Sequence, residues 1–289
     1  MKAAIIALVL ASSTLAHAGP WTRDQGHFYL NTSYSRISAT SFYNPEFKRI
    51  PLSPYVQHVW GLYGEVGIVS RWLTATVDAV LFRHNGLVDK GATYGMGDWR
   101  VGLWTGLVTR PVRLSFGLTV GIPIGDAHPQ AGPTADTDAT HLANSLPTGD
   151  GEVDLEGRLA LGYSFGGVRR WPVVHYLVVE AGYWLRTKRA EFSDAFVWKF
   201  ELGTKFPWKF IERFWFTWRW NGVESFASSA QAAMNATGLG NGVTYIAPGA
   251  SVYGRVWQGL GASIALDSAV RARSLPVAVQ VMAAVSYQW

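Results

Sequence analysis

The sequence has no cysteine, little charge and no long apolar run beyond its first residues. The absence of cysteine among 289 residues excludes disulfide bonds, thiolate catalysis and a lipid anchor on a cysteine. Charged residues make up 16% of the chain, whereas aromatic residues make up 14% and include 14 tryptophans. A secreted soluble enzyme usually carries more charge and less tryptophan.

No segment after residue 18 offers the roughly 18 uncharged apolar residues that a transmembrane helix needs. A chain that crosses lipid without such a helix must close into a β-barrel, because every backbone N–H and C=O needs an internal partner. The formal net charge of +5 is a mild excess. Lysine and arginine form no stripe with interleaved aromatic residues, so we expect no nucleic-acid partner.

The first 18 residues predict a secretory signal peptide. Met1-Lys2 is a short positive region, Ala3 to Leu15 is apolar, and Ala16-His17-Ala18 is a small-x-small cleavage site. The alternative, a membrane anchor, is disfavoured because the apolar run is too short to span a bilayer. We expect cleavage after residue 18 and one outer-membrane barrel domain over residues 19–289, with too few residues before the first strand for a plug domain.

The last residues alternate strictly between two faces, which predicts a strand with one apolar side. Bacterial outer-membrane β-barrels typically end on an aromatic residue, so this segment resembles their closing strand. We expect it to engage the barrel-assembly machinery. The apolar face consists of Val277, Val279, Val281, Ala283, Val285, Tyr287 and Trp289.

A similar alternation recurs about twelve times along the chain. We therefore predict an all-β fold, a transmembrane antiparallel up-and-down β-barrel of about twelve strands whose apolar faces contact outer-membrane lipids. A soluble β-sandwich, the alternative, would have to bury the tryptophans that fall near the strand ends. The strands are expected at 26–37, 55–69, 72–82, 96–109, 111–122, 152–164, 173–186, 194–206, 210–221, 243–257, 259–269 and 276–289.

The connectors alternate between long and short, as do the long outer loops and short periplasmic turns of such barrels. The long connectors are expected at 38–54, 83–95, 123–151 and 223–242, and the short ones near 70–71, 110, 165–172, 207–209 and 258. Aromatic girdles are expected from Trp72, Trp171, Trp208, Trp257 and Trp289 on the periplasmic side and from Trp218 and Trp220 on the outer side.

Two segments depart from the repeat. The loop at 123–150 either folds into the lumen or over its mouth, or stays an exterior loop, and the sequence leaves both open. The segment from Ser225 to Asn235 predicts a short helix, with Ser225 as its N-cap and Gly238 as its stop signal.

Alternation assigns most of the charged strand residues to the lumen. We expect the acidic side chains, on the fourth to sixth strands, to face the basic ones, on the eighth to tenth. Two interpretations stay open: a structural network, since buried charges need partners, or a constriction that contacts a solute. The candidate lumen residues are Asp78, Asp98, Arg100, Trp104, Glu152, Asp154, Glu156, Arg158, Lys199, Glu201, Arg213, Arg219 and Arg255.

Three short motifs carry a family resemblance. They are Gly95-Met96-Gly97-Asp98, Gly121-Ile122-Pro123-Ile124-Gly125-Asp126, and Pro147-Thr148-Gly149-Asp150-Gly151 followed by Val153-Asp154-Leu155. Their order resembles the outer-membrane family named "MetA-pathway of phenol degradation". The resemblance implies a barrel that transports aromatic or apolar compounds, with Asp98 and Asp154 as the best matched residues. Ile124 stands where that family usually has threonine.

Enzymatic alternatives find little support. Lipid-hydrolysing barrels need a histidine and a serine together, yet no mature histidine is followed two residues later by serine. His58 and His175 are expected near a rim or facing outward. His128 and His141 share the long loop with Asp126, but their spacing fits no familiar metal site.

We therefore expect no enzyme and no cofactor, but an outer-membrane channel for passive uptake of a small, aromatic or apolar solute. Two other functions stay open: a lipid- or lipopolysaccharide-modifying enzyme, and a plugged structural or adhesive barrel.

Overall fold

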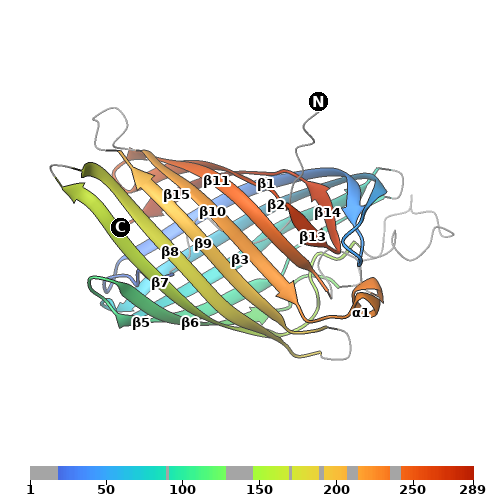
Figure 1. Cartoon of the computed structure of the whole chain (residues 1–289), viewed down its shortest axis with the longest axis horizontal. Coiled ribbons are helices and arrows are strands. Elements are labelled where there is room, and N and C mark those ends of the chain that lie inside the picture. The colour runs from blue at the N-terminus through green and yellow to red at the C-terminus, as the bar shows by residue number, and fades with distance from the viewer. Residues whose placement is uncertain are drawn as a thin grey trace.

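The computed structural model describes residues 19–88, 91–127, 146–168, 171–188, 192–206, 214–234 and 242–289. These residues form one antiparallel sheet and one short helix (Figure 1). The strands are β1 (Phe28–Tyr43), β2 (Arg49–Val69), β3 (Leu73–Leu87), β4 (Gly91–Gly95), β5 (Trp99–Val108), β6 (Arg113–Ile122), β7 (Asp154–Val168), β8 (Trp171–Arg186), β9 (Ala195–Lys205), β10 (Phe214–Ser225), β11 (Thr244–Trp257), β12 (Leu260–Asp267), β13 (Arg271–Arg273), β14 (Leu275–Ala278) and β15 (Gln280–Gln288), and the helix is α1 (Ser229–Met234).

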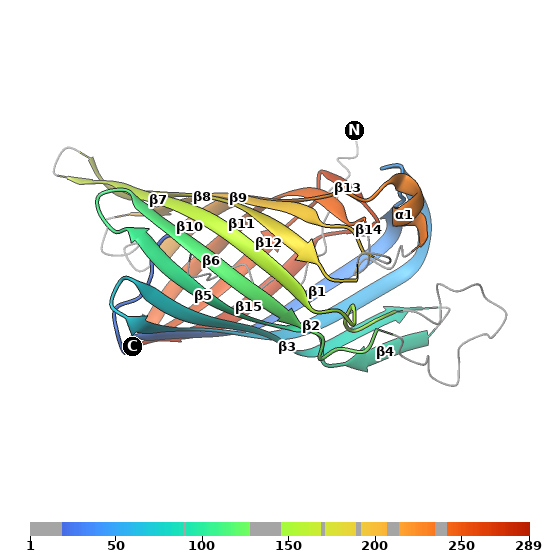
Figure 2. The ribbon, with the colours of Figure 1, turned by 90° about the horizontal axis from the view of Figure 1, so that it is seen from below.

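Twelve of the strands close into an antiparallel barrel, which confirms the predicted fold (Figures 1 and 2). The wall runs in the order β1, β2, β3, β5, β6, β7, β8, β9, β10, β11, β12 and β15, and β15 pairs with β1 to close the ring. The three remaining strands extend the wall at one end: β4 pairs with β3, β13 with β11 and β14 with β1. The helix α1 spans six residues, and the described part of the chain contains no helix with the length and hydropathy of a membrane span.

The wall has an apolar outer face and a polar inner face, because successive side chains of a strand point to opposite sides. On β2, Trp60 points outward and is 52% exposed, whereas Tyr63 points inward and is 2% exposed. Along β1 the odd-numbered residues from Tyr29 to Tyr43 are buried in the same way. The orientation is therefore the predicted one, with apolar side chains toward lipid and polar ones in the lumen.

The two ends of the barrel differ in the length of their connections. At one end β2 joins β3 through residues 70–72, and β11 joins β12 through residues 258–259. At the other end lie the connections 123–153, 226–243 with α1, and 268–279 with β13 and β14 (Figure 1). Short turns belong to the periplasmic end, so α1 marks the outer end.

Two of the predicted outer loops are mostly strand. Because β1 and β2 continue outward, only residues 44–48 remain of the connector expected at 38–54. Most of the connector expected at 83–95 is likewise a hairpin, in which the outer part of β3 pairs with β4. The alternation of apolar and polar residues ends where lipid contact ends. The strands continue beyond that point because their backbone groups still pair with neighbouring strands.

The predicted closing strand at 276–289 is divided into β14 and β15. Pairing between β12 and β15 stops at Asp267 and Gln280, and beyond this point β13 follows β11 while β14 follows β1. Both faces of β14 are buried. The prediction that Val277 faces lipid is therefore wrong, since it is 7% exposed and packs in an internal cluster.

That internal cluster fills the outer part of the lumen with apolar side chains. It draws on β1, β2, β3, β9, β10 and β11 and on the connection 268–279, so it joins opposite parts of the wall. We call it the outer apolar cluster. It contains Ile37, Ala39, Tyr43, Tyr55, Leu87, Ala195, Val197, Val223, Tyr245, Ala247, Ala269, Ala272, Leu275, Val277 and Ala278.

The helix begins three residues later than predicted. Ser225 is the last residue of β10 and not an N-cap. The cap is Ser228, whose hydroxyl accepts from the Gln231 N–H at 3.2 Å, while the Gln231 side chain accepts from the Ser228 N–H at 2.9 Å. This reciprocal pair is a capping box. The expected stop signal at Gly238 lies outside the described residues.

The segment before β1, residues 19–27, enters the periplasmic end of the lumen with residues 19–23, whereas residues 24–27 are exposed at the rim. We call it the N-terminal segment. The Ser115 hydroxyl donates to the Gly19 carbonyl at 2.6 Å. Arg23 forms an ion pair with Glu65 at 2.5 Å. Ser115 and Glu65 are lumen-facing and almost fully buried. We expected these residues to be too few for a plug domain, yet a short segment suffices to fill this end.

Candidate functional site

A ladder of ion pairs follows the lumen wall across β5, β7, β8 and β9. Acidic and basic side chains alternate along it, and most members are buried. The contacts are Arg100–Asp154 at 3.9 Å, Arg100–Glu156 at 3.3 Å, Arg158–Glu156, Arg158–Glu180 at 3.1 Å, Lys199–Glu180 at 3.6 Å and Lys199–Glu201 at 3.1 Å.

The ladder differs from the expected separation of an acidic and a basic side of the lumen. Glu180 and Lys199 are direct partners in the register of β8 and β9, so their charges compensate at short range. Arg100 reaches across β6 to Asp154 because Gly121 lies between them, and a Cβ there would overlap the carboxylate. Buried charges are stable only with such partners, which explains why the two signs alternate.

A second group of charges lies nearer the outer end. Arg186 forms ion pairs with Asp150 at 2.8 Å and with Glu152, and its guanidinium lies 4.5 Å from the ring centroid of Trp184. Burial raises the pKa of Asp150, although Arg186 acts to lower it. Burial likewise raises the pKa of Glu152 against the effect of Arg186.

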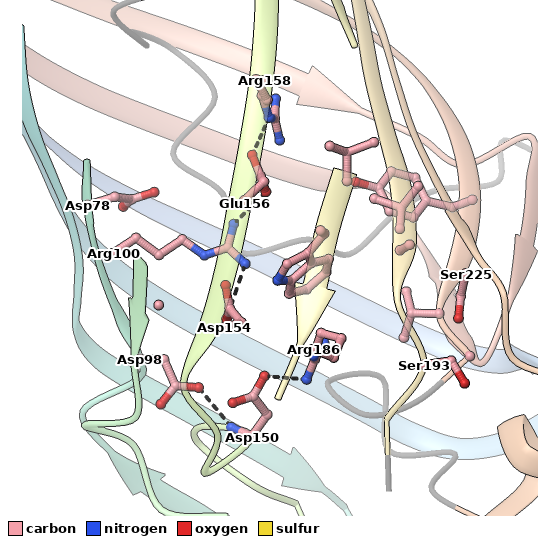
Figure 3. A pocket seen from close by; sticks show the side chains of 18 of the residues that line it. Asp78, Asp98, Arg100, Asp150, Asp154, Glu156, Arg158, Arg186, Ser193 and Ser225 are labelled. Atoms are coloured by element: carbon pink, nitrogen blue, oxygen red, sulfur yellow. Dashed lines mark hydrogen bonds and ion pairs between the residues drawn. The ribbon is translucent and has the colours of Figure 1, made fainter. Parts of the chain in front are cut away.

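Two adjoining cavities occupy the lumen beside these charges. The larger one has a volume of about 160 Å³ and the smaller one about 90 Å³. Both contact the central part of the ladder. Figure 3 shows Arg100 beside Asp154 and Glu156 in the wall of the larger cavity. The residues that line both cavities are Asp78, Arg100, Glu156, Arg158, Val223 and Tyr245.

The larger cavity is lined by apolar side chains as well as by charged ones. Trp184, Val197, Val223 and Tyr245 line it. Val197, Val223 and Tyr245 belong to the outer apolar cluster, so the cavity lies directly below that cluster. A solute in this space would contact both apolar surface and paired ions.

The three motifs that carry the family resemblance meet at one point, Asp98. Its carboxylate accepts from the N–H of Gly125 at 3.0 Å and from the N–H of Asp150 at 2.8 Å. Gly149 is required there, because a Cβ would overlap the Asp98 carboxylate. Asp98 thus joins the outer ends of β5, β6 and β7 and holds backbone, so its role in the structure differs from that of Asp154 in the ladder.

Residues 146–150 form a strap that is held inside the mouth of the barrel. Arg83 donates to the Thr148 carbonyl at 2.9 Å, Asn85 to the Pro147 carbonyl at 2.8 Å, and Thr93 to the Leu146 carbonyl at 2.5 Å. This end of the predicted 123–150 loop therefore folds inward. Residues 128–145, between its two ends, lie outside the described residues.

The other predicted lumen residues also point inward where the structure describes them. Trp104 is 5% exposed and packs over Gly117. Arg219 and Asp267 form a buried bidentate pair, with Nε to Oδ1 at 2.8 Å. Arg255 lies over the Trp215 ring at 5.6 Å, near the periplasmic end. Arg213 lies outside the described residues.

Several lining residues escaped the sequence analysis. Trp184 and Arg186 share the inward face of β8 with Glu180, so the same alternation would have found them. Arg83 was hidden by a register shift between β2 and β3 near Gly61, which moves the inward positions of β3 from even to odd numbers. Asp150 lies in a loop, where no periodicity exists.

The histidines on strands lie outside the lumen, as expected. His58 forms a hydrogen bond of 2.6 Å with the outward-facing Tyr34, and His175 stacks on the exposed Phe165. Within the described ranges, no three of His, Asp and Glu converge as metal ligands would. His128 and His141, considered for a cation in the sequence, fall in the part that the structure does not describe.

Comparison with known proteins places this geometry among bacterial outer-membrane barrels. The chain is similar to the COG4313 outer membrane channel from Pseudomonas putida F1, with a TM-score of 0.63, 10% identity and coverage of 98% of this chain and 100% of that one. The β domain of the Bordetella autotransporter BrkA gives a TM-score of 0.51 with 14% identity, over 92% of this chain and 100% of that one.

The fold is that of an outer-membrane β-barrel. At these identities the likeness is one of fold alone. No family model and no curated protein matches the chain, so membership of the family named from the three motifs stays a prediction. Channels and autotransporter domains both occur among similar structures, which means that this barrel's function has to be inferred from its own lumen.

Proposed function

We propose that this outer-membrane barrel is a channel for small solutes that combine an aromatic or apolar body with a polar or anionic group. The observation that carries the proposal is the pair of adjoining cavities inside the wall, with volumes of about 160 Å³ and 90 Å³. A cavity of about 150 Å³ accommodates benzene, so a single aromatic ring matches the larger cavity in size. The name of the P. putida channel agrees with a channel role.

The composition of the cavity wall supports the amphipathic class. Tyr245, Val197 and Val223 offer apolar surface. Arg100, whose side chain is 31% exposed, is the most accessible cation of the ladder. A guanidinium binds a carboxylate through two parallel hydrogen bonds. A small aromatic acid would therefore place its ring against the apolar side chains and its carboxylate on Arg100.

A plugged barrel is the second candidate, because parts of the chain fill both ends of the lumen. The N-terminal segment occupies the periplasmic end, and the outer apolar cluster crosses the other. Passage of a solute requires that these contacts open transiently. The two candidates predict opposite results when the refolded protein is placed in a membrane.

Swelling of proteoliposomes separates the two candidates. Vesicles that contain the refolded full-length protein are diluted into iso-osmotic benzoate, glucose or a trisaccharide, and the rate of swelling is followed by light scattering. We expect swelling with benzoate at a faster rate than with glucose, and none with the trisaccharide. Rates equal to those of protein-free vesicles for all three solutes would contradict the channel and favour the plugged barrel.

A further inference from the structure

A row of basic and aromatic side chains crosses the outside of the barrel near its outer end. Arg36 on β1 is the direct register partner of His58 on β2, which in turn is the partner of His84 on β3. Tyr94 on β4 continues the row as the partner of His84. Partners in register lie side by side on the same face of the sheet, so these four side chains form one exterior line that slopes with the tilt of the strands.

The height of His58, in the middle of this row, matches the outer boundary of the apolar belt. His58 lies eleven residues from Val69, the periplasmic end of β2. A tilted strand rises about 2.5 Å per residue along the barrel axis, so His58 stands about 27 Å above that end, close to the roughly 25 Å height of an apolar belt. Directly below lie the exposed aromatic side chains Tyr34, Trp60 and Phe82. Such aromatics mark the level of the headgroups.

The positive charge of the row is not compensated by neighbouring acids. The strands β1 to β4 contain two acidic residues, Glu65 and Asp78, and both face the lumen. Among the ion pairs of the described residues, none includes Arg36. An exposed guanidinium at headgroup level without an acidic partner is complementary to an anionic headgroup.

The two histidines of the row lie close together beside Arg36, where they can add hydrogen-bond donors. The rings of His58 and His84 lie 5.5 Å apart, and Nδ1 of His58 is engaged by the Tyr34 hydroxyl at 2.6 Å. A neutral imidazole that accepts a hydrogen bond at Nδ1 carries its own hydrogen on Nε2. His58 can therefore donate through Nε2 while its ring orientation is fixed by Tyr34.

We propose that Arg36, His58 and His84 bind the phosphate of a phosphorylated lipid in the outer leaflet. The guanidinium and the imidazole Nε2 of His58 donate to the phosphate oxygens, which are strong acceptors for arginine. The acyl chains lie below, against Tyr34 and Trp60. Lipid A, a phosphorylated glycolipid with several acyl chains, has the required chemistry. The site is separate from the lumen and independent of the proposed channel function.

Native mass spectrometry of the full-length protein in detergent tests this proposal. Diphosphoryl lipid A is titrated against the wild type and against the triple variant Arg36→Gln, His58→Gln, His84→Gln. We expect one tightly bound lipid on the wild type and an affinity about tenfold lower in the variant, because the variant loses the charge-assisted hydrogen bond from Arg36 to the phosphate. Heat-modifiable migration on gels verifies that each variant is folded.

Arg271→Gln is the matched control, because Arg271 is also exposed at the outer end but is paired with Glu224 at 3.0 Å. It should bind lipid A as the wild type does. Dephosphorylated lipid A should bind the wild type about as weakly as diphosphoryl lipid A binds the triple variant. Equal affinities of wild type and triple variant for diphosphoryl lipid A would overturn the proposal. Displacement of lipid A by millimolar inorganic phosphate would show that the site binds free phosphate, and this would overturn its assignment as a lipid site.

Discussion

At the scale of single residues, the inner face of this barrel consists of ions that neutralise one another at short range. Arg219 and Asp267 illustrate this, since the arginine is 1% exposed and the aspartate 4%. The sequence makes Arg219 a candidate for the solute path, but its two hydrogen bonds to one buried carboxylate favour a structural role. Arg100 differs, because part of its side chain remains accessible from both cavities.

Arg219→Ala should lower the free energy of unfolding by about 3 kcal/mol, because it leaves the Asp267 carboxylate buried without a partner. Urea unfolding in lipid vesicles, followed by tryptophan fluorescence, measures the change. The double variant Arg219→Ala, Asp267→Ala should recover part of the loss, since no charge is then left unpaired. A double variant less stable than Arg219→Ala would show that the unpaired Asp267 carboxylate does not cause the loss of stability.

Arg100→Gln should reduce the uptake of benzoate more than the uptake of glucose, because only benzoate has a carboxylate for the guanidinium. Arg100→Lys, which keeps the positive charge, is the matched control and should retain most of the preference. The swelling assay gives both rates in the same vesicles. An equal reduction for the two solutes in Arg100→Gln would assign Arg100 to the structural ladder alone.

At the scale of elements, three short segments that are not part of the twelve-stranded wall determine what fills the lumen. The N-terminal segment lies in the periplasmic end, the strap at 146–150 lines the mouth, and the connection 268–279 contributes to the outer apolar cluster. Asp98 connects the strap to the turn after β6. The wall itself is continuous, so these segments are the parts that can regulate passage.

Deletion of residues 19–23 should raise the ionic conductance of the refolded protein, because it removes the segment that occupies the periplasmic end. Glu65 then loses its partner Arg23, so the deletion is combined with Glu65→Gln. The single variant Glu65→Gln, with the segment intact, is the control and should conduct as the wild type does. Unchanged conductance of the deletion variant would locate the narrowest point elsewhere.

Asp98→Ala should loosen the strap, because the N–H groups of Gly125 and Asp150 both lose their acceptor. Hydrogen exchange measured by mass spectrometry should become faster in residues 123–127 and 146–150, with the β7 and β8 peptides unchanged. Asp78→Ala removes another lumen-facing carboxylate and serves as the comparison. If exchange in these segments is the same in both variants, Asp98 does not hold them.

At the scale of the whole molecule, the fold was predictable from the sequence because one physical rule acts on every strand. Lipid outside and water inside impose alternation, so the twelve wall strands and their inward charges such as Glu156 could be identified. Features that depend on local geometry were not predictable. The register shift near Gly61 conceals Arg83, and the split of the closing strand buries Val277. The inward path of the N-terminal segment has no periodicity to reveal it.

The family motifs gained a physical explanation that the sequence could not provide. Their glycines and aspartates lie far apart in sequence but meet where Asp98 binds the backbone of two loops. Such a motif reports how the outer ends of three strands are held together. It therefore supports the barrel architecture more directly than it supports a substrate, and the solute class has to be argued from the cavities.

Single-channel conductance in a planar lipid bilayer tests the central claim, that the lumen is a path for small solutes. The account predicts small, steady currents from the refolded wild-type protein, which benzoate reduces in a concentration-dependent manner while glucose does not. Arg100→Gln should conduct but lose the benzoate effect. A correctly folded barrel that passes no current under any of these conditions, with or without the N-terminal segment, would contradict the account.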